Sequence, residues 1–224
     1  KFGCLKDDKF CEKMNDYILF KNIDGIYMAL PECLEVKPMD TEEDDASAVD
    51  EEGNDIDRAP ALDNVVVTTT QGGIDLVCVD DRDILLNASF DTRGFFVHQG
   101  RWIIDGSKNY VKTTDFRVDG REDGGENYFS VNQLTLTNGH GELYGGMDVG
   151  TLTLSGSGFD MYSWVEADAV SVTNGNCRVA ENGSLITKDL TLNNSVYAEG
   201  WYTEVTNKLT MTNGSRLDVW CDMH

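Results

Sequence analysis

Aromatic residues recur at a fixed distance from a repeated phrase, and their spacing fits a binding surface. Trp201 and Trp220 each lie eleven residues after the first apolar residue of their own repeat, and Tyr202 follows Trp201. Ten or twelve residues into earlier repeats, the same region holds Tyr144, Tyr162 and Trp164. An aromatic face matches the apolar C–H face of a sugar, while the polar tips of Tyr and Trp can still find hydrogen-bond partners. We therefore expect these six residues to form a sugar-stacking column.

Two other arrangements fit the same spacing. The rings can pack on one another or beneath the N-terminal segment, since aromatic pairs stabilise sheets in any case. They can also anchor a protein partner, because Trp and Tyr are favoured at interfaces. Glu181 occupies the eleventh position of an intervening repeat, so we expect the column to be interrupted there.

Carboxylates are the other side chains that could do chemistry. Asp105 and Asp119 each follow a short apolar run and precede a glycine. Two carboxylates on either side of a glycosidic bond can act as acid and base. Asp before Gly is also an ordinary turn sequence. His98 and His140 occur in other sequence contexts, and we expect neither to lie beside an Asp pair. We favour the turn.

Calcium is the one cofactor that the sequence suggests. Oxygen ligands suit Ca²⁺, and Asp80, Asp81 and Asp83 form the densest acidic cluster inside the repeat region. A solvated turn explains the same residues, because they lie between two apolar strand segments. We expect no other cofactor.

A repeated phrase defines the elements that position these side chains. The segment 134–139, Leu-Thr-Leu-Thr-Asn-Gly, returns in modified form from Leu152, Val170, Leu190 and Leu209, at steps of 18, 18, 20 and 19 residues. A short period with alternating apolar residues is typical of a β-solenoid. Each unit holds two further apolar patches, so we expect three short strands in each coil of 18–20 residues.

Alternation along each strand predicts which side chains face the core. The apolar members of the phrase should point inward, with Thr and Ser pointing outward. The predicted core residues are Leu134, Leu136, Leu152, Leu154, Val170, Val172, Leu190, Leu192, Leu209 and Met211. The Asn residues at the shared turn indicate either a hydrogen-bonded ladder along the rod or a left-handed turn conformation.

The chain divides into three parts. Residues 1–39 lack the repeat and should cap the solenoid, with a short helix over 8–19 where apolar residues follow a helical spacing. Residues 40–63 contain a dense acidic run and should form a disordered loop. The solenoid should occupy 64–224, since a 19-residue step aligns Val65 with Ile84 and Ile84 with Ile103.

The period, the strand triplets and the Asn-bearing turns resemble the parallel β-helix superfamily over residues 64–221. Its right-handed members include pectate lyases, polygalacturonases, phage tailspikes and bacterial adhesins. The resemblance implies an all-β, single-stranded, right-handed parallel β-helix. For catalysis it implies Ca²⁺ with a basic residue in a lyase, or clustered Asp residues in a hydrolase. It rests on the repeat pattern and on no catalytic motif.

Charge restricts the partners. A net charge of −22 repels phosphate backbones and anionic membranes, so we expect no nucleic-acid partner. No apolar run approaches the roughly 18 residues of a membrane span, so we expect no membrane insertion. The same charge favours a monomer. Because Lys1 stands where a Met would, we expect a processed chain whose signal has been removed. Together with the solenoid pattern, this favours a bacterial protein that is secreted or held at the cell surface.

These observations together predict a non-catalytic polysaccharide-binding protein. One alternative is an adhesin or structural spacer whose rod displays a surface for a protein partner. The other alternative is a uronate polysaccharide lyase or hydrolase, which the fold permits but which the residues support less well.

Overall fold

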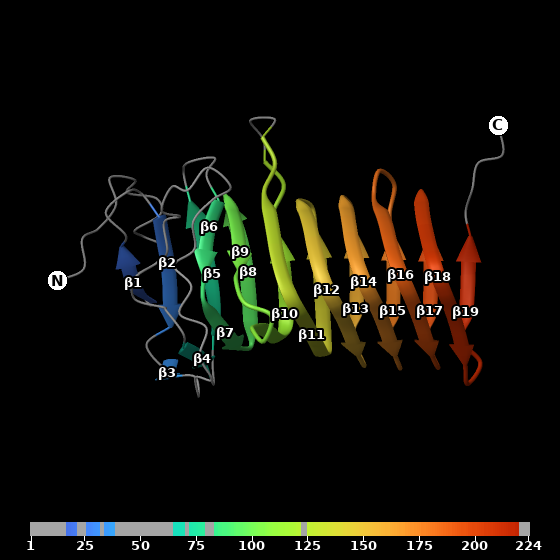
Figure 1. Cartoon of the computed structure of the whole chain (residues 1–224), viewed down its shortest axis with the longest axis horizontal. Helices are drawn as coiled ribbons and strands as arrows, with labels where there is room; N and C mark the ends of the chain where they lie inside the picture. Colours follow the sequence, from blue (N-terminus) through green and yellow to red (C-terminus); the bar gives the residue numbers. More distant parts are fainter. Residues whose placement is uncertain are drawn as a thin grey trace.

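The computed structural model describes residues 17–21, 26–31, 34–38, 65–69, 72–78, 83–121 and 125–219. These residues form nineteen strands and no helix. Parallel strands stack along a rod and build a β-solenoid of about seven turns (Figure 1). The expected all-β parallel β-helix is therefore confirmed.

Each coil contributes one strand segment to each of three sheets, which we name A, B and C in the order that the chain visits them. Sheet A contains β4 (Val65–Thr69), β7 (Ala88–Asp91), the first half of β10 (Tyr110–Val118), the middle of β11 (Tyr128–Leu143), and the second halves of β12 (Gly146–Ser155), β14 (Trp164–Thr173), β16 (Ser184–Asn193) and β18 (Tyr202–Thr212).

Sheets B and C complete the coils. Sheet B contains β5 (Gly73–Cys78), β8 (Gly94–Gln99), the second half of β10, the end of β11, β13 (Gly158–Met161), β15 (Asn176–Val179), β17 (Val196–Glu199) and β19 (Arg216–Val219). Sheet C contains β6 (Asp83–Leu86), β9 (Arg101–Ile104) and the first segments of β11, β12, β14, β16 and β18. We call the turns between them the A–B, B–C and C–A corners.

The repeated phrase forms sheet A in the register that its period predicts. Leu134 pairs with Leu152, and the same row continues through Val170, Leu190 and Leu209. The predicted core residues are buried in every coil but the last. Leu209 and Met211 are 44% and 39% exposed, because a solenoid residue is buried by the coils on both sides of it. Among the described residues, no coil follows β18.

The 19-residue alignment of the early coils is wrong. Val65 lies in sheet A and pairs with Ala88, which is 23 residues later. Ile84 lies in sheet C and pairs with Trp102. The early coils are longer, and strands of all three sheets carry the same inward alternation, so their apolar runs look equivalent in the sequence.

The Asn residues at the A–B corner share the predicted left-handed conformation, and one pair of them also forms the predicted hydrogen bond. Asn138, Asn174, Asn194 and Asn213 have φ angles between 50° and 53°, the left-handed region, and Gly156 takes the same conformation at the equivalent corner. Asn194 Nδ2 donates a hydrogen bond to Asn174 Oδ1 at 2.9 Å. The corner residue therefore both turns the chain and links neighbouring coils.

Antiparallel strands cover the N-terminal edge of the solenoid. These strands are β1 (Tyr17–Lys21), β2 (Ile26–Pro31) and β3 (Leu34–Pro38). β2 pairs with β5, and β3 pairs with β4. The helix expected over 8–19 is wrong for residues 17–19, which lie in β1, and residues 8–16 lie outside the described part. The predicted acidic loop at 40–63 also lies outside it.

Candidate functional site

The outer face of sheet C presents an aromatic ring on every second coil. Tyr128 pairs with Gly146, and the same row continues with Trp164, Ser184 and Tyr202. We call Tyr128, Trp164 and Tyr202 the aromatic row. Since parallel strands lie about 4.8 Å apart, the backbone positions of these residues are offset by about 9.5 Å along the rod, and the rings themselves can approach more closely.

Glycine and a protruding loop fix the Trp164 ring. Its indole lies against Gly146, where a Cβ would overlap the ring. Its centroid is 5.9 Å from that of Tyr128, with the planes inclined at 32°. The indole N–H donates to Glu126, which belongs to the loop that rises from the rod between β10 and β11 (Figure 1). Buried Asn127 ties that loop to the backbone carbonyl of His98.

Carboxylates hold the two tyrosines of the aromatic row. Tyr128 donates its hydroxyl to Asp148 at 2.5 Å, and Tyr202 donates to Glu204 at 2.7 Å. Burial, followed by the hydrogen bond to Asp148, raises the pKa of Tyr128 to about 12. The phenol therefore keeps its proton and remains a donor at neutral pH. The guanidinium of Arg101 lies 4.5 Å from the centre of the Tyr128 ring.

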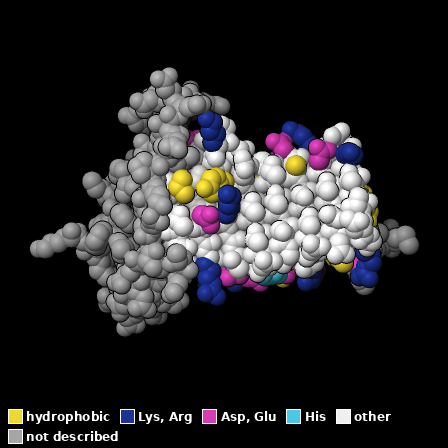
Figure 2. Space-filling model, turned by 90° about the horizontal axis from the view of Figure 1, so that it is seen from below, with side chains coloured by type: hydrophobic (Ala, Val, Ile, Leu, Met, Phe, Trp, Pro, Cys, Tyr) yellow, Lys and Arg dark blue, Asp and Glu magenta, His cyan; other side chains and the backbone are white. Residues whose placement is uncertain are grey.

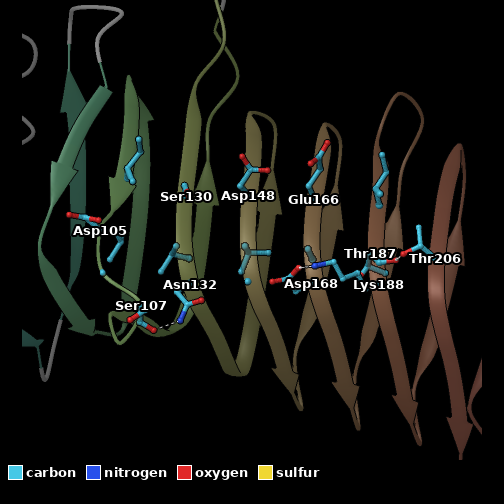
Figure 3. Close-up of a pocket in the computed structure, with 18 residues that line it drawn as sticks. Asp105, Ser107, Ser130, Asn132, Asp148, Glu166, Asp168, Thr187, Lys188 and Thr206 are labelled. Atoms are coloured by element: carbon cyan, nitrogen blue, oxygen red, sulfur yellow. Dashed lines mark hydrogen bonds and ion pairs between the residues drawn. The ribbon is translucent and has the colours of Figure 1, made fainter. Parts of the chain in front are cut away.

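A groove of about 740 Å³ runs beside the aromatic row, along sheet C and the C–A corner (Figure 3). Six successive strands line it, from β9 to β18. Its charged lining residues are Asp105, Asp148, Glu166, Asp168 and Lys188. Lys188 is ion-paired with Asp168 at 2.5 Å. The groove is open along its length, so it can hold an extended ligand.

The structure distributes the predicted aromatic column over a corner and a face. Tyr144 and Tyr162 lie at the B–C corner, where their rings stack in parallel with centroids 4.6 Å apart. Trp201 lies at the same corner, two coils after Tyr162, and is 63% exposed. Trp164 and Tyr202 instead lie on sheet C, where Tyr202 is 45% exposed. Trp220 lies outside the described residues.

Sequence reasoning missed Tyr128. The prediction counted only forward from each copy of the phrase, whereas Tyr128 precedes the first copy. Counting six residues back from Leu134 and from Val170 finds Tyr128 and Trp164, which share one row of sheet C. The signal was therefore present in the sequence, in the segment before each phrase.

The acid–base pair considered from the sequence does not form. Asp105 follows a strand of sheet C, whereas Asp119 follows a strand of sheet B. Asp119 instead lies 2.7 Å from Nδ1 of His98, and Asp75 lies 2.7 Å from Nε2 of the same ring. The expectation that neither His98 nor His140 lies beside an Asp pair is wrong for His98, which lies between Asp75 and Asp119.

His98 is an imidazolium at neutral pH. Hydrogen bonds to Asp119 and then to Asp75 raise its pKa to about 9. Arg117 contacts Asp119 as well, and it binds Glu142 at 2.9 Å. Both ring nitrogens are therefore occupied, and this side chain is not free to act as a base. The cluster joins strands of successive coils by ion pairing.

One of the three calcium candidates is described. Asp83 is ion-paired with Arg101 at 2.5 Å, so its carboxylate is already neutralised. Asp80 and Asp81 lie outside the described residues. In the described part of the chain, no three His, Cys, Asp or Glu side chains gather where they could hold a metal ion.

Comparison with known proteins gives no relative: no family model, no curated protein and no solved structure matches this chain. Within the described ranges, no helix could cross a membrane. The class of the protein is therefore defined by its own features, a parallel β-solenoid with a groove along one sheet.

Proposed function

We propose that the protein binds a polysaccharide along the outer face of sheet C and does not cleave it. The observation that carries this proposal is the aromatic row, which lies beside a groove that crosses six strands. A linear glycan is a chain of similar rings, and a solenoid is a stack of similar coils. Successive sugar rings can therefore contact equivalent positions on successive coils.

The fixed geometry of the rings favours binding. Glu126 holds Trp164, Asp148 holds Tyr128 and Glu204 holds Tyr202. Side chains that are already ordered lose less conformational entropy when a ligand arrives. Each stacked sugar contributes little alone, and several contacts along one polymer add up to useful affinity.

Cleavage receives less support from the same surface. His98 and Asp119 are engaged in ion pairs on sheet B. The one lysine that lines the groove, Lys188, is paired with Asp168. A lyase needs a free basic residue, and a hydrolase needs two carboxylates of different pKa across the bond.

Binding of a glycan panel tests the proposal. We expect Trp164→Ala and Tyr202→Ala each to weaken binding by about three- to tenfold, the size of one stacking contact. Tyr110→Ala is the matched control, because Tyr110 lies on sheet A and contacts Lys112. Unchanged affinity in both sheet C variants would rule out the aromatic row as the binding surface. No new reducing ends or unsaturated products should appear.

A protein partner is the second candidate, as for an adhesin or spacer. The exposure of Trp201, together with the exposed apolar residues of the last coil, favours it. In that case Trp201→Ala abolishes capture of the partner and leaves glycan binding unchanged. Under either candidate we place the protein outside the cell or on its surface, as a monomer without a metal cofactor; Ca²⁺ dependence of glycan binding would revise the last point.

A further inference from the structure

We infer that the groove takes an amine-bearing polysaccharide, of the polyglucosamine type, in preference to a neutral or a uronate polymer. The inference rests on the proposed function, because it assumes that a glycan lies along sheet C. It adds the chemical class of that glycan, which the charge of the groove determines.

The lining of the groove is negative. Four carboxylates line it, from Asp105, Asp148, Glu166 and Asp168, and Lys188 is the one cationic side chain among its lining residues. The fixed charge of the lining is therefore three negative units at neutral pH. A uronate polymer would be repelled, and an ammonium-bearing polymer would be attracted along the whole groove.

Two of these carboxylates are neighbours without a cation between them. Asp148 and Glu166 are register partners on adjacent strands of sheet C. Like charges opposite each other destabilise a sheet. Asp148 accepts a hydrogen bond from the neutral phenol of Tyr128, and Lys188 pairs with Asp168. Among the described residues, no ion pair involves Asp148 or Glu166.

Several carboxylates on other parts of the rod are paired with cations. On sheet B, His98 lies between Asp75 and Asp119, and Arg117 binds Glu142. At the start of sheet C, Arg101 binds Asp83. Figure 2 shows one face of the rod that is mostly uncharged, with most of its charged side chains along the two long margins. Asp148 and Glu166 differ from these paired carboxylates, because they face each other on adjacent strands of the groove without a cation from the described residues between them.

The aromatic row identifies the ligand as a sugar chain. A polyamine or a basic peptide would also be attracted by the charge, but it offers no rings to stack on Tyr128, Trp164 and Tyr202. In a linear glycan whose alternate residues are turned over, the same face recurs at every second sugar. The residues that carry the rings recur at every second coil, with the Tyr128 and Trp164 rings 5.9 Å apart, so aromatic contact and charge pairing can both extend along one ligand.

Calorimetry with matched oligomers tests the inference. We would compare oligomers of glucosamine, N-acetylglucosamine and galacturonate of equal length at about pH 5.5, where carboxylates are ionised. The glucosamine oligomer should bind about tenfold more tightly than the acetylated one, and added salt should remove the difference. The galacturonate oligomer should bind most weakly.

Charge-neutralising variants identify the site. Asp148→Asn with Glu166→Gln should weaken binding of the glucosamine oligomer about tenfold and that of the acetylated oligomer less than twofold, since each pair near a surface contributes about two- to fivefold. Asp91→Asn is the matched control, because Asp91 is exposed on sheet A. Circular dichroism verifies that each variant is folded.

The outcomes separate the two proposals. Equal affinity for the amine and the acetylated oligomer, without salt dependence, would overturn the inference and leave glycan binding intact. Failure of every oligomer to bind would overturn both. Binding of an oligolysine as tight as that of the glucosamine oligomer would overturn the assignment to a sugar and indicate a basic peptide instead. An equal effect of Asp91→Asn would show that the attraction comes from the overall charge.

Discussion

His98 joins three successive coils through a single ring. Asp75 comes from the first coil, His98 from the second and Asp119 from the third. Two carboxylates stacked in this way would repel each other, and the imidazolium between them converts that repulsion into attraction. The three residues are 23 and 21 positions apart in the sequence, so only the stacking of coils brings them together.

Deprotonation of His98 should weaken the solenoid. Its pKa is 6.5 in an unfolded chain and about 9 in the folded one. The stabilisation is therefore fully present below about pH 6.5 and is lost as the pH rises through 9. We expect His98→Gln to lower the free energy of unfolding by about 1 kcal/mol at neutral pH, because the ring is partly exposed. Urea titrations of both proteins should show the difference shrinking above pH 9; a constant difference would contradict the ion-pair role.

Gly146 controls the position of the Trp164 indole. Gly146→Ala places a methyl group where the ring now lies, so the indole must rotate away. We expect weaker glycan binding, by about three- to tenfold as for loss of one stacking contact, with little change in stability. The control is Gly120→Ala, since the space around that glycine accepts a Cβ at ordinary contact distance. Binding that is unaffected by Gly146→Ala would show that the ring orientation is irrelevant.

At the scale of elements, asparagine at the A–B corner has two roles, which are to adopt the left-handed conformation and to hydrogen-bond to the next coil. Asn174 adopts φ of 53° and accepts a hydrogen bond from Asn194. Asn174→Ala should lower the free energy of unfolding by about 1–2 kcal/mol, because an alanine resists the left-handed conformation. Asn174→Gly removes the same hydrogen bond but accommodates that conformation, so it should cost less. Thermal unfolding of both variants measures the two effects; equal losses would attribute the whole effect to the side-chain hydrogen bond.

The repeated phrase allowed sheet A to be predicted from residue 134 onward. Its Leu and Val residues all face the core and recur at nearly constant steps. The strand pairing of sheet A therefore follows from the number of residues between copies of the phrase. Upstream, Val65 and Ile84 belong to different sheets, yet both begin short apolar runs in the sequence. The upstream coils differ in length because their turns differ in length. The alternation of apolar and polar residues along a strand does not indicate how long the next turn is.

The candidate site was predictable in part. The aromatic spacing predicted one column of rings on a sheet face. The structure instead has Tyr144, Tyr162 and Trp201 at the B–C corner, and it has Trp164 and Tyr202 on sheet C. The groove could not be predicted, because it is formed by residues of six strands whose outward direction depends on the register of sheet C. The contact of Glu126 with Trp164 comes from a loop 38 residues earlier, and no sequence period connects the two.

At the scale of the whole molecule, the two ends of the described rod differ. Antiparallel strands cover the first coil, whereas Leu209, Met211, Leu217 and Val219 in the last described coil are exposed. Burial of a core residue therefore depends on its place along the rod as well as on its position in the repeat.

Equivalent substitutions at register partners test this dependence. Leu190→Ala should lower the free energy of unfolding by about 2–5 kcal/mol, because it leaves a cavity in a buried layer. Leu209→Ala, at the paired position one coil later, should cost less than about 1 kcal/mol. Denaturant titrations give both values. Similar losses at the two positions would mean that Leu209 is covered in solution, and they would support a partner at that end.

The antiparallel cover of the first coil also gives the rod a mechanical direction. Hydrogen bonds between coils run along the rod, so a force applied along that axis separates strands one after another instead of shearing them. Among the described coils, the one that contains β18 and β19 pairs with a coil on one side, so it should separate first. Each coil of 18 residues that peels away lengthens the tether by about 60 Å. Under tension along its axis, the protein should therefore extend in steps, with coils unfolding from the β19 end while the first coil stays folded.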